Sequence, residues 1–122
     1  MFDNLKAMGA VAGLLKNQDK LKSAMERVKR TLADTRLTGE SGGGAVRAIV
    51  TGDLRVLSIE VGPALATGLA ADSSRRMAET LITEAVNDGL RKAQAEAGRL
   101  VSAEAKELGL PDLPGGLSGL LG

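Results

Sequence analysis

The chain has 122 residues, with 16 Lys and Arg against 15 Asp and Glu, and it contains no histidine, cysteine, tryptophan or tyrosine. Without cysteine, a disulfide framework and a thiolate metal site are both excluded. Without histidine, the most common general base and metal ligand is missing. The length is that of one domain. These observations predict a binding protein and not an enzyme, with no cofactor and no small-molecule substrate.

No segment of the sequence has the pattern of a membrane span or a secretion signal. The longest apolar run, Met8–Leu15, is far shorter than the roughly 18 residues that a transmembrane helix needs. The first residues lack a charged-then-apolar pattern with a small-residue cleavage site. A membrane-surface helix is disfavoured because Phe2 is the one aromatic residue. We therefore expect a cytoplasmic protein without a membrane partner.

Residues 3 to about 34 have the pattern of a single long helix. Apolar positions spaced by three and four residues form a heptad-like seam with one polar interruption: Leu14, Gln18, Leu21, Met25, Val28 and Leu32. A helix of about 30 residues is roughly 45 Å long, which exceeds the width of a small domain. This helix is therefore expected to project from the body or to pack on a partner.

The periodicity then changes to that of β-strands. Three antiparallel strands are expected, at Leu37–Ser41, Ala45–Thr51 and Leu54–Val61. Gly42–Gly44 resembles a phosphate-binding loop, but it lacks the lysine and hydroxyl of a P-loop, so a tight turn is favoured. Gly52–Asp53, with glycine first, predicts a two-residue type II′ hairpin turn.

A second long helix is expected from residue 72 to about 108. Its buried stripe is expected to comprise Met77, Leu81, Ile82, Ala85, Val86, Leu90, Ala93, Ala97, Leu100 and Val101. Asn87–Asp88 lies inside this stripe. It is either a functional contact or catalytic pair or, as we favour, a polar point that fixes the register of a helix–helix or dimer contact.

The elements together predict an α+β fold with the order α-β-β-β-α, in which a three-stranded antiparallel sheet lies between two long helices. Residues 1–109 form the domain, and residues 110–122 form a flexible tail rich in Gly, Leu and Pro. Two long helices cannot cover their apolar stripes within so small a monomer. We therefore expect an obligate homodimer.

Basic residues recur along both helices. Those with regular helical spacing are Lys22, Lys29 and Arg36, then Lys16, Lys20, Arg27 and Arg30, and finally Arg91, Lys92, Arg99 and Lys106. Such stripes can follow phosphates. Alternatively they are solvated helix faces, for which Asp19, Glu26, Asp34, Glu96 and Glu104 offer partners on the same helix. Since aromatic stacking residues are lacking, any nucleic acid bound is expected to be duplex DNA.

The chain resembles the YbaB/EbfC nucleoid-associated DNA-binding proteins over roughly residues 1–105. The motifs that carry the resemblance are Met1-Phe2-Asp3-Asn4-Leu5 with Met8, Leu15-Lys16-Asn17-Gln18 with Leu21, Thr38-Gly39-Glu40-Ser41-Gly42-Gly43-Gly44-Ala45-Val46, Thr51-Gly52-Asp53, Ile59 with Pro63, and Glu84-Ala85-Val86-Asn87-Asp88-Gly89-Leu90-Arg91-Lys92-Ala93.

This resemblance implies a tweezer-like homodimer whose helices project as arms that grip double-stranded DNA, in a bacterial nucleoid protein that organises the chromosome and influences transcription. It implies that the DNA contacts come from basic residues of both helices. The residues expected to bind DNA are Lys16, Lys20, Lys22, Arg27, Lys29 and Arg30, followed by Arg91, Lys92 and Arg99. The alternative is a protein–protein adaptor of the same fold that does not bind DNA.

Overall fold

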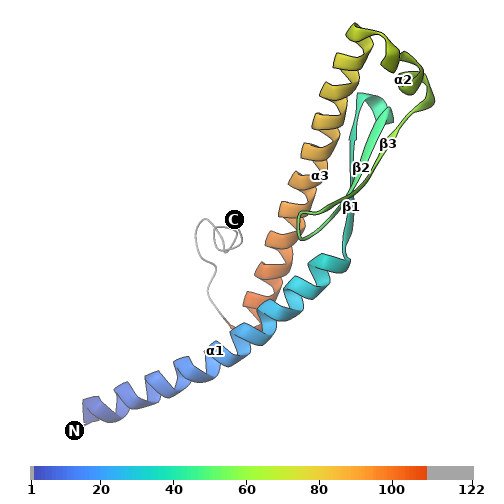
Figure 1. Ribbon diagram of the computed structural model, residues 1–122. Coiled ribbons are helices and arrows are strands. Elements are labelled where there is room, and N and C mark those ends of the chain that lie inside the picture. The colour runs from blue at the N-terminus through green and yellow to red at the C-terminus, as the bar shows by residue number, and fades with distance from the viewer. Residues whose placement is uncertain (1, 110–122) are drawn as a thin grey trace.

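The computed structural model describes the backbone of residues 2–109 and the side chains of residues 18–109 (Figure 1). In chain order the elements are α1 (Phe2–Asp34), β1 (Arg36–Ser41), β2 (Val46–Thr51), β3 (Val56–Val61), α2 (Pro63–Thr67) and α3 (Asp72–Glu107). The predicted α-β-β-β-α order and α+β class are confirmed. The short helix α2 lies in a connection for which the sequence suggested no structure. The predicted tail, 110–122, lies outside the described residues.

The three strands form one antiparallel sheet in the order β1-β2-β3, and α3 packs on one of its faces. Val46, Ala48 and Val50 of β2 are fully buried, and Val46 and Ala48 form a cluster with Ala85 of α3. Gly42–Gly44 forms a 3-10 turn between β1 and β2 with positive φ at all three glycines, so the predicted tight turn is confirmed. The sheet thus buries the alternating apolar side of β2 beneath one helix.

The buried stripe of α3 consists mainly of small residues. Its buried members are Ala78, Ala85, Gly89, Ala93, Ala97, Val101 and Ala105. The larger side chains predicted for this stripe mostly lie at its margins, and Met77 is 61% exposed, so its predicted burial is wrong. Small side chains allow the strand backbone to approach the helix closely. A Cβ built on Gly39 of β1 would lie 2.1 Å from the Ala85 carbonyl oxygen and 2.3 Å from the Gly89 nitrogen.

The β2–β3 hairpin differs from the predicted type II′ turn. The Leu54 N–H donates to the Thr51 carbonyl, and the Thr51 N–H donates to the Arg55 carbonyl. The positive φ of 68° falls on Leu54 and not on Gly52. This is a three-residue loop of the bulged type. Glycine is required at position 52 for a different reason, since a Cβ there would lie 2.7 Å from the Leu32 side chain.

Within residues 18–34 of α1, the buried positions lie toward the C-terminal end of the helix. Val28 and Leu32 form a buried cluster with Ala97 and Val101 of α3. Leu21, two seam positions before Val28, is 40% exposed, and α1 extends beyond the end of α3 (Figure 1). The predicted seam is therefore covered only in part, and α1 projects as an arm.

Among residues 2–109, no helix is both long enough and apolar enough to cross a membrane.

Candidate nucleic-acid interface

The basic residues of the projecting helix are solvent-exposed. Lys20, Lys22, Lys29 and Arg30 are all exposed, and none of them forms an ion pair with another side chain of residues 18–109. The side chain of Lys16 lies outside the described residues. Cationic side chains without carboxylate partners are available to contact phosphates, which carry the main attraction of proteins for DNA.

Four of the basic residues of α1 lie on two flanks of the helix. Lys22 and Lys29 are seven positions apart, or about 10 Å along the helix, and lie on one flank. Lys20 and Arg27 have the same spacing and lie on the other flank. The buried residue Val28, which packs on α3, lies between the two flanks. The helix therefore presents two separate basic edges with its packed face between them.

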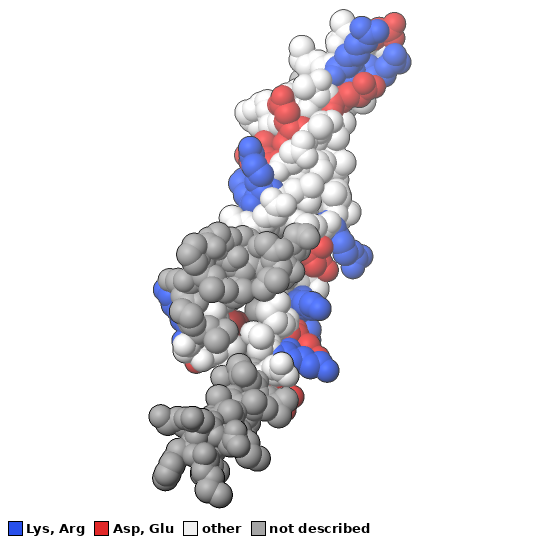
Figure 2. Space-filling view, turned by 90° about the vertical axis from the view of Figure 1, so that its left-hand side faces the viewer, with Lys and Arg blue, Asp and Glu red and all other residues white. Residues whose placement is uncertain are grey.

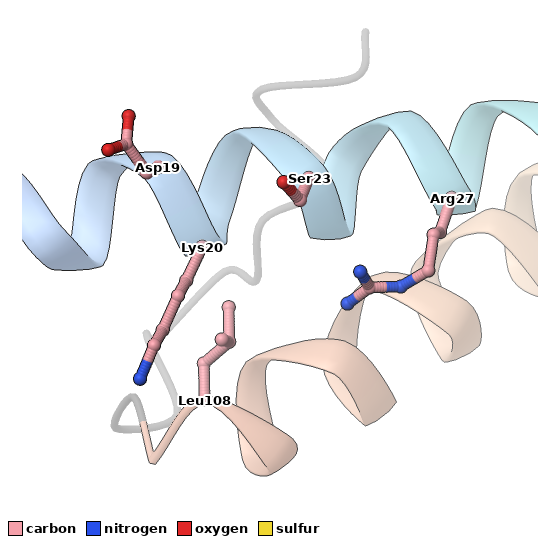
Figure 3. Close-up of a pocket in the computed structure, with 5 residues that line it drawn as sticks. All are labelled: Asp19, Lys20, Ser23, Arg27 and Leu108. Carbon is pink, nitrogen blue, oxygen red and sulfur yellow. The ribbon is translucent and has the colours of Figure 1, made fainter.

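The Lys20–Arg27 flank faces the end of α3. The Arg27 guanidinium lies 3.2 Å from the Glu104 carboxylate. Lys20, Ser23 and Arg27 line an open pocket of about 370 Å³ together with Asp19 and Leu108. In Figure 3 the Lys20 and Arg27 side chains extend toward α3, whereas Asp19 points away from it.

The ion pair differs from the alternative of a solvated helix face, in which Glu104 would pair with a basic residue of its own helix. Arg27 and Glu104 are 77 positions apart in the chain. No pattern within α1 or α3 indicates their proximity, since it depends on the angle at which the two helices cross.

The three residues of α3 that were predicted to bind DNA all have partners within the chain. Arg91 Nη2 lies 2.7 Å from Asp88 Oδ1, and Arg99 Nε lies 3.1 Å from Glu96 Oε2. The latter pair lowers the pKa of Glu96 and raises that of Arg99. Lys92 Nζ donates to the Thr38 carbonyl at 2.9 Å. Arg91, Lys92 and Arg99 are exposed, but part of the donor capacity of each is already used within the chain.

Asp88 connects α3 to the free edge of β1. Its carboxylate accepts a hydrogen bond from the Glu40 N–H at 3.0 Å and pairs with Arg91 and with Lys92, the latter at 3.1 Å. The Glu40 N–H, followed by Arg91 and Lys92, holds the pKa of Asp88 far below its usual value. Asp88 is therefore a polar anchor between helix and strand, whereas Asn87 is exposed.

Two further exposed arginines lie where α1 meets the sheet. Arg36 is paired with Thr51 across the β1–β2 ladder, and the Arg55 carbonyl accepts the Thr51 N–H from the opposite side. The strand register places both arginines beside Thr51. From the sequence, the β2–β3 hairpin alone would have predicted that Arg55 lies near Thr51, but not that Arg36 does. On the face shown in Figure 2, basic side chains lie beside acidic ones at several points along the elongated molecule.

Comparisons with known proteins give a family match and a fold match. The sequence model of the YbaB/EbfC DNA-binding family matches residues 8–108. Nucleoid-associated protein Pfl01_1806 of Pseudomonas fluorescens (strain Pf0-1) is 29% identical over 103 residues, covering 84% of this chain and 91% of that protein. The crystal structure of uncharacterized protein HP0035 from Helicobacter pylori has a TM-score of 0.60 at 22% identity, covering 76% of this chain and 90% of that one. The structural match supports the fold.

Proposed function

The chain belongs to the YbaB/EbfC DNA-binding family, and from this premise we propose that it is a nucleoid-associated protein that binds double-stranded DNA. The observation that carries the proposal is the projecting helix α1. Its exposed lysines and arginines, Lys20, Lys22, Lys29 and Arg30, have no carboxylate partner among residues 18–109. Such side chains neutralise phosphates and release counterions with little discrimination between base sequences.

Within this proposal the Lys22–Lys29 flank is the primary contact surface. It lies away from the ion pair that holds Arg27 to α3. Arg91, Lys92 and Arg99 of α3 are secondary contacts, because their cations are already hydrogen-bonded within the chain. Binding of this kind, spread along the chromosome, would serve chromosome organisation and gene regulation in the nucleoid.

The protein is proposed to act as a homodimer, and β3 supports this. Val56, Leu57 and Ile59 are 46%, 44% and 42% exposed on a strand at the edge of the sheet. Ile59 of β3 pairs with the buried residue Ala48 of β2, so its side chain lies on the same face of the sheet that α3 covers over β1 and β2. A second copy that buries this strip would remove an exposed apolar edge, which is otherwise prone to aggregation.

The test is fluorescence anisotropy with a random-sequence duplex of about 30 base pairs across a salt series. We expect saturable binding whose log–log salt dependence has a slope of about −0.9 for each phosphate contacted. Replacing both Lys22 and Lys29 by glutamate should abolish binding while the protein keeps its oligomeric state. The control variant, Arg75→Glu with Arg76→Glu, makes the same change of charge near the N-terminal end of α3. It should retain most of the binding.

Normal binding by the Lys22→Glu/Lys29→Glu variant would refute the placement of the contact surface. Absence of binding by the unmodified protein at low salt would reject DNA binding itself. The protein–protein adaptor of the same fold would then be the better explanation.

A further inference from the structure

The two basic flanks of α1 differ in one respect that affects DNA binding. On one flank, Lys22 and Lys29 form no ion pair with residues 18–109. On the other flank, the guanidinium of Arg27 is paired with Glu104 at 3.2 Å. Arg27 therefore reaches the solvent with its charge already compensated.

Glu104 is the better fixed member of this pair. Its side chain is 24% exposed, whereas that of Arg27 is 51% exposed. Its position on α3 is set by the packing of Val101 and Ala97 against α1. The carboxylate therefore remains beside Arg27 as long as the two helices stay packed.

A DNA phosphate and the Glu104 carboxylate would bind the same guanidinium group, which offers a planar set of N–H donors to either anion. A phosphate that approached Arg27 would also come close to the negative charge of Glu104. Like charges at short distance oppose each other, so the carboxylate weakens this contact both by occupying the Nη2 donor of Arg27 and by repulsion.

We propose that Glu104 competes with the DNA backbone for Arg27 and thereby sets the affinity of the protein below what its basic arms would allow. This inference rests on the proposed DNA binding and assigns to α3 a residue that regulates contacts made by α1. Lys22 and Lys29 provide the contacts that do not depend on Glu104.

The experiment compares the Glu104→Gln variant with the unmodified protein in DNA anisotropy across a salt series. Glutamine keeps the size of the side chain and removes its charge. We expect severalfold tighter binding at about 50 mM salt and a log–log slope that is steeper by about 0.9 for each arm that reaches DNA.

Two further variants isolate the cause of the change. Glu84→Gln removes the same charge from an exposed position about 30 Å away along α3, and it should leave the slope unchanged. In the Arg27→Gln background, Glu104→Gln should no longer increase the affinity, because the competed cation is gone. Circular dichroism melting of each variant verifies that the fold is retained.

Equal affinity gains in the Glu104→Gln and Glu84→Gln variants would overturn the inference in favour of a general charge effect. A gain that persists without Arg27 would overturn it as well, as would unchanged binding by a folded Glu104→Gln variant. In each of these cases the unmodified protein still binds DNA. If it binds none at low salt, the proposed function fails first and this inference fails with it.

Discussion

Replacing Gly39 by alanine places a methyl group where β1 and α3 leave no room for one. The new Cβ would lie 2.1 Å from the Ala85 carbonyl oxygen and 2.3 Å from the Gly89 nitrogen, both of them backbone atoms. Ordinary contacts begin at 3.4 Å, so strand and helix must separate by about 1.3 Å at this point. No rotamer change relieves a clash with backbone atoms.

The separation also disturbs the groups on either side of Gly39. The Thr38 carbonyl accepts from Lys92, and the Glu40 N–H donates to Asp88, so both hydrogen bonds would lengthen. Overpacking in a core typically costs about 1–3 kcal/mol. Because this clash is with two backbone atoms, we expect a loss of about 3 kcal/mol, at the upper end of that range, which is a large part of the roughly 5–15 kcal/mol that stabilises a domain.

The assay is thermal unfolding by circular dichroism at fixed protein concentration, since association would shift the midpoint. The Gly39→Ala variant should melt at least about 10 °C below the unmodified protein. The matched control is Gly98→Ala on α3, where a Cβ meets nothing within 4 Å. It should stabilise the helix by up to about 1 kcal/mol. A Gly39→Ala midpoint within about 2 °C of the unmodified protein would refute the reasoning from the close approach.

Two other predictions concern the β1 edge and the β3 strip. Asp88→Asn should lower stability at neutral pH, because the depressed pKa makes the ionised carboxylate stabilising. That contribution is present above the ordinary value of 3.8 and is lost as pH falls through the lower folded-state pKa. The melting difference between the two proteins should therefore shrink in acid, and a difference that grows would contradict this assignment. Ile59→Lys should convert the proposed dimer to monomer in light scattering, whereas Ser58→Lys, on the other face of β3, should affect it less.

Local patterns were sufficient to predict the order and the type of the main elements. The glycine run, the alternating strands and the two long periodic segments lie within two residues of the observed bounds. The hairpin was mispredicted because glycine at position 52 was attributed to backbone conformation, whereas the structure shows a close approach to Leu32. A sequence cannot distinguish these two requirements for glycine, since both are met by the absence of a Cβ.

The candidate DNA-binding residues were likewise predictable from the sequence only in part. Helical spacing predicted that the basic residues of α1 form regular stripes, since spacing along a helix fixes the face on which a residue lies. Which cations already have partners could not be predicted. Arg27 with Glu104, and Lys92 with Thr38, are joined across 77 and 54 positions of the chain. These contacts depend on helix crossing and strand register, which arise from long-range packing.

The sequence by itself therefore determined the elements of this protein, its basic arm and its lack of histidine, cysteine, tryptophan and tyrosine, because these depend on residue type and local periodicity. Only the tertiary structure decided that small residues of α3 admit the backbone of β1, that Asp88 anchors helix to strand, and that Arg27 on one flank of α1 is paired with Glu104. Those features depend on which distant surfaces meet, and no local pattern encodes that.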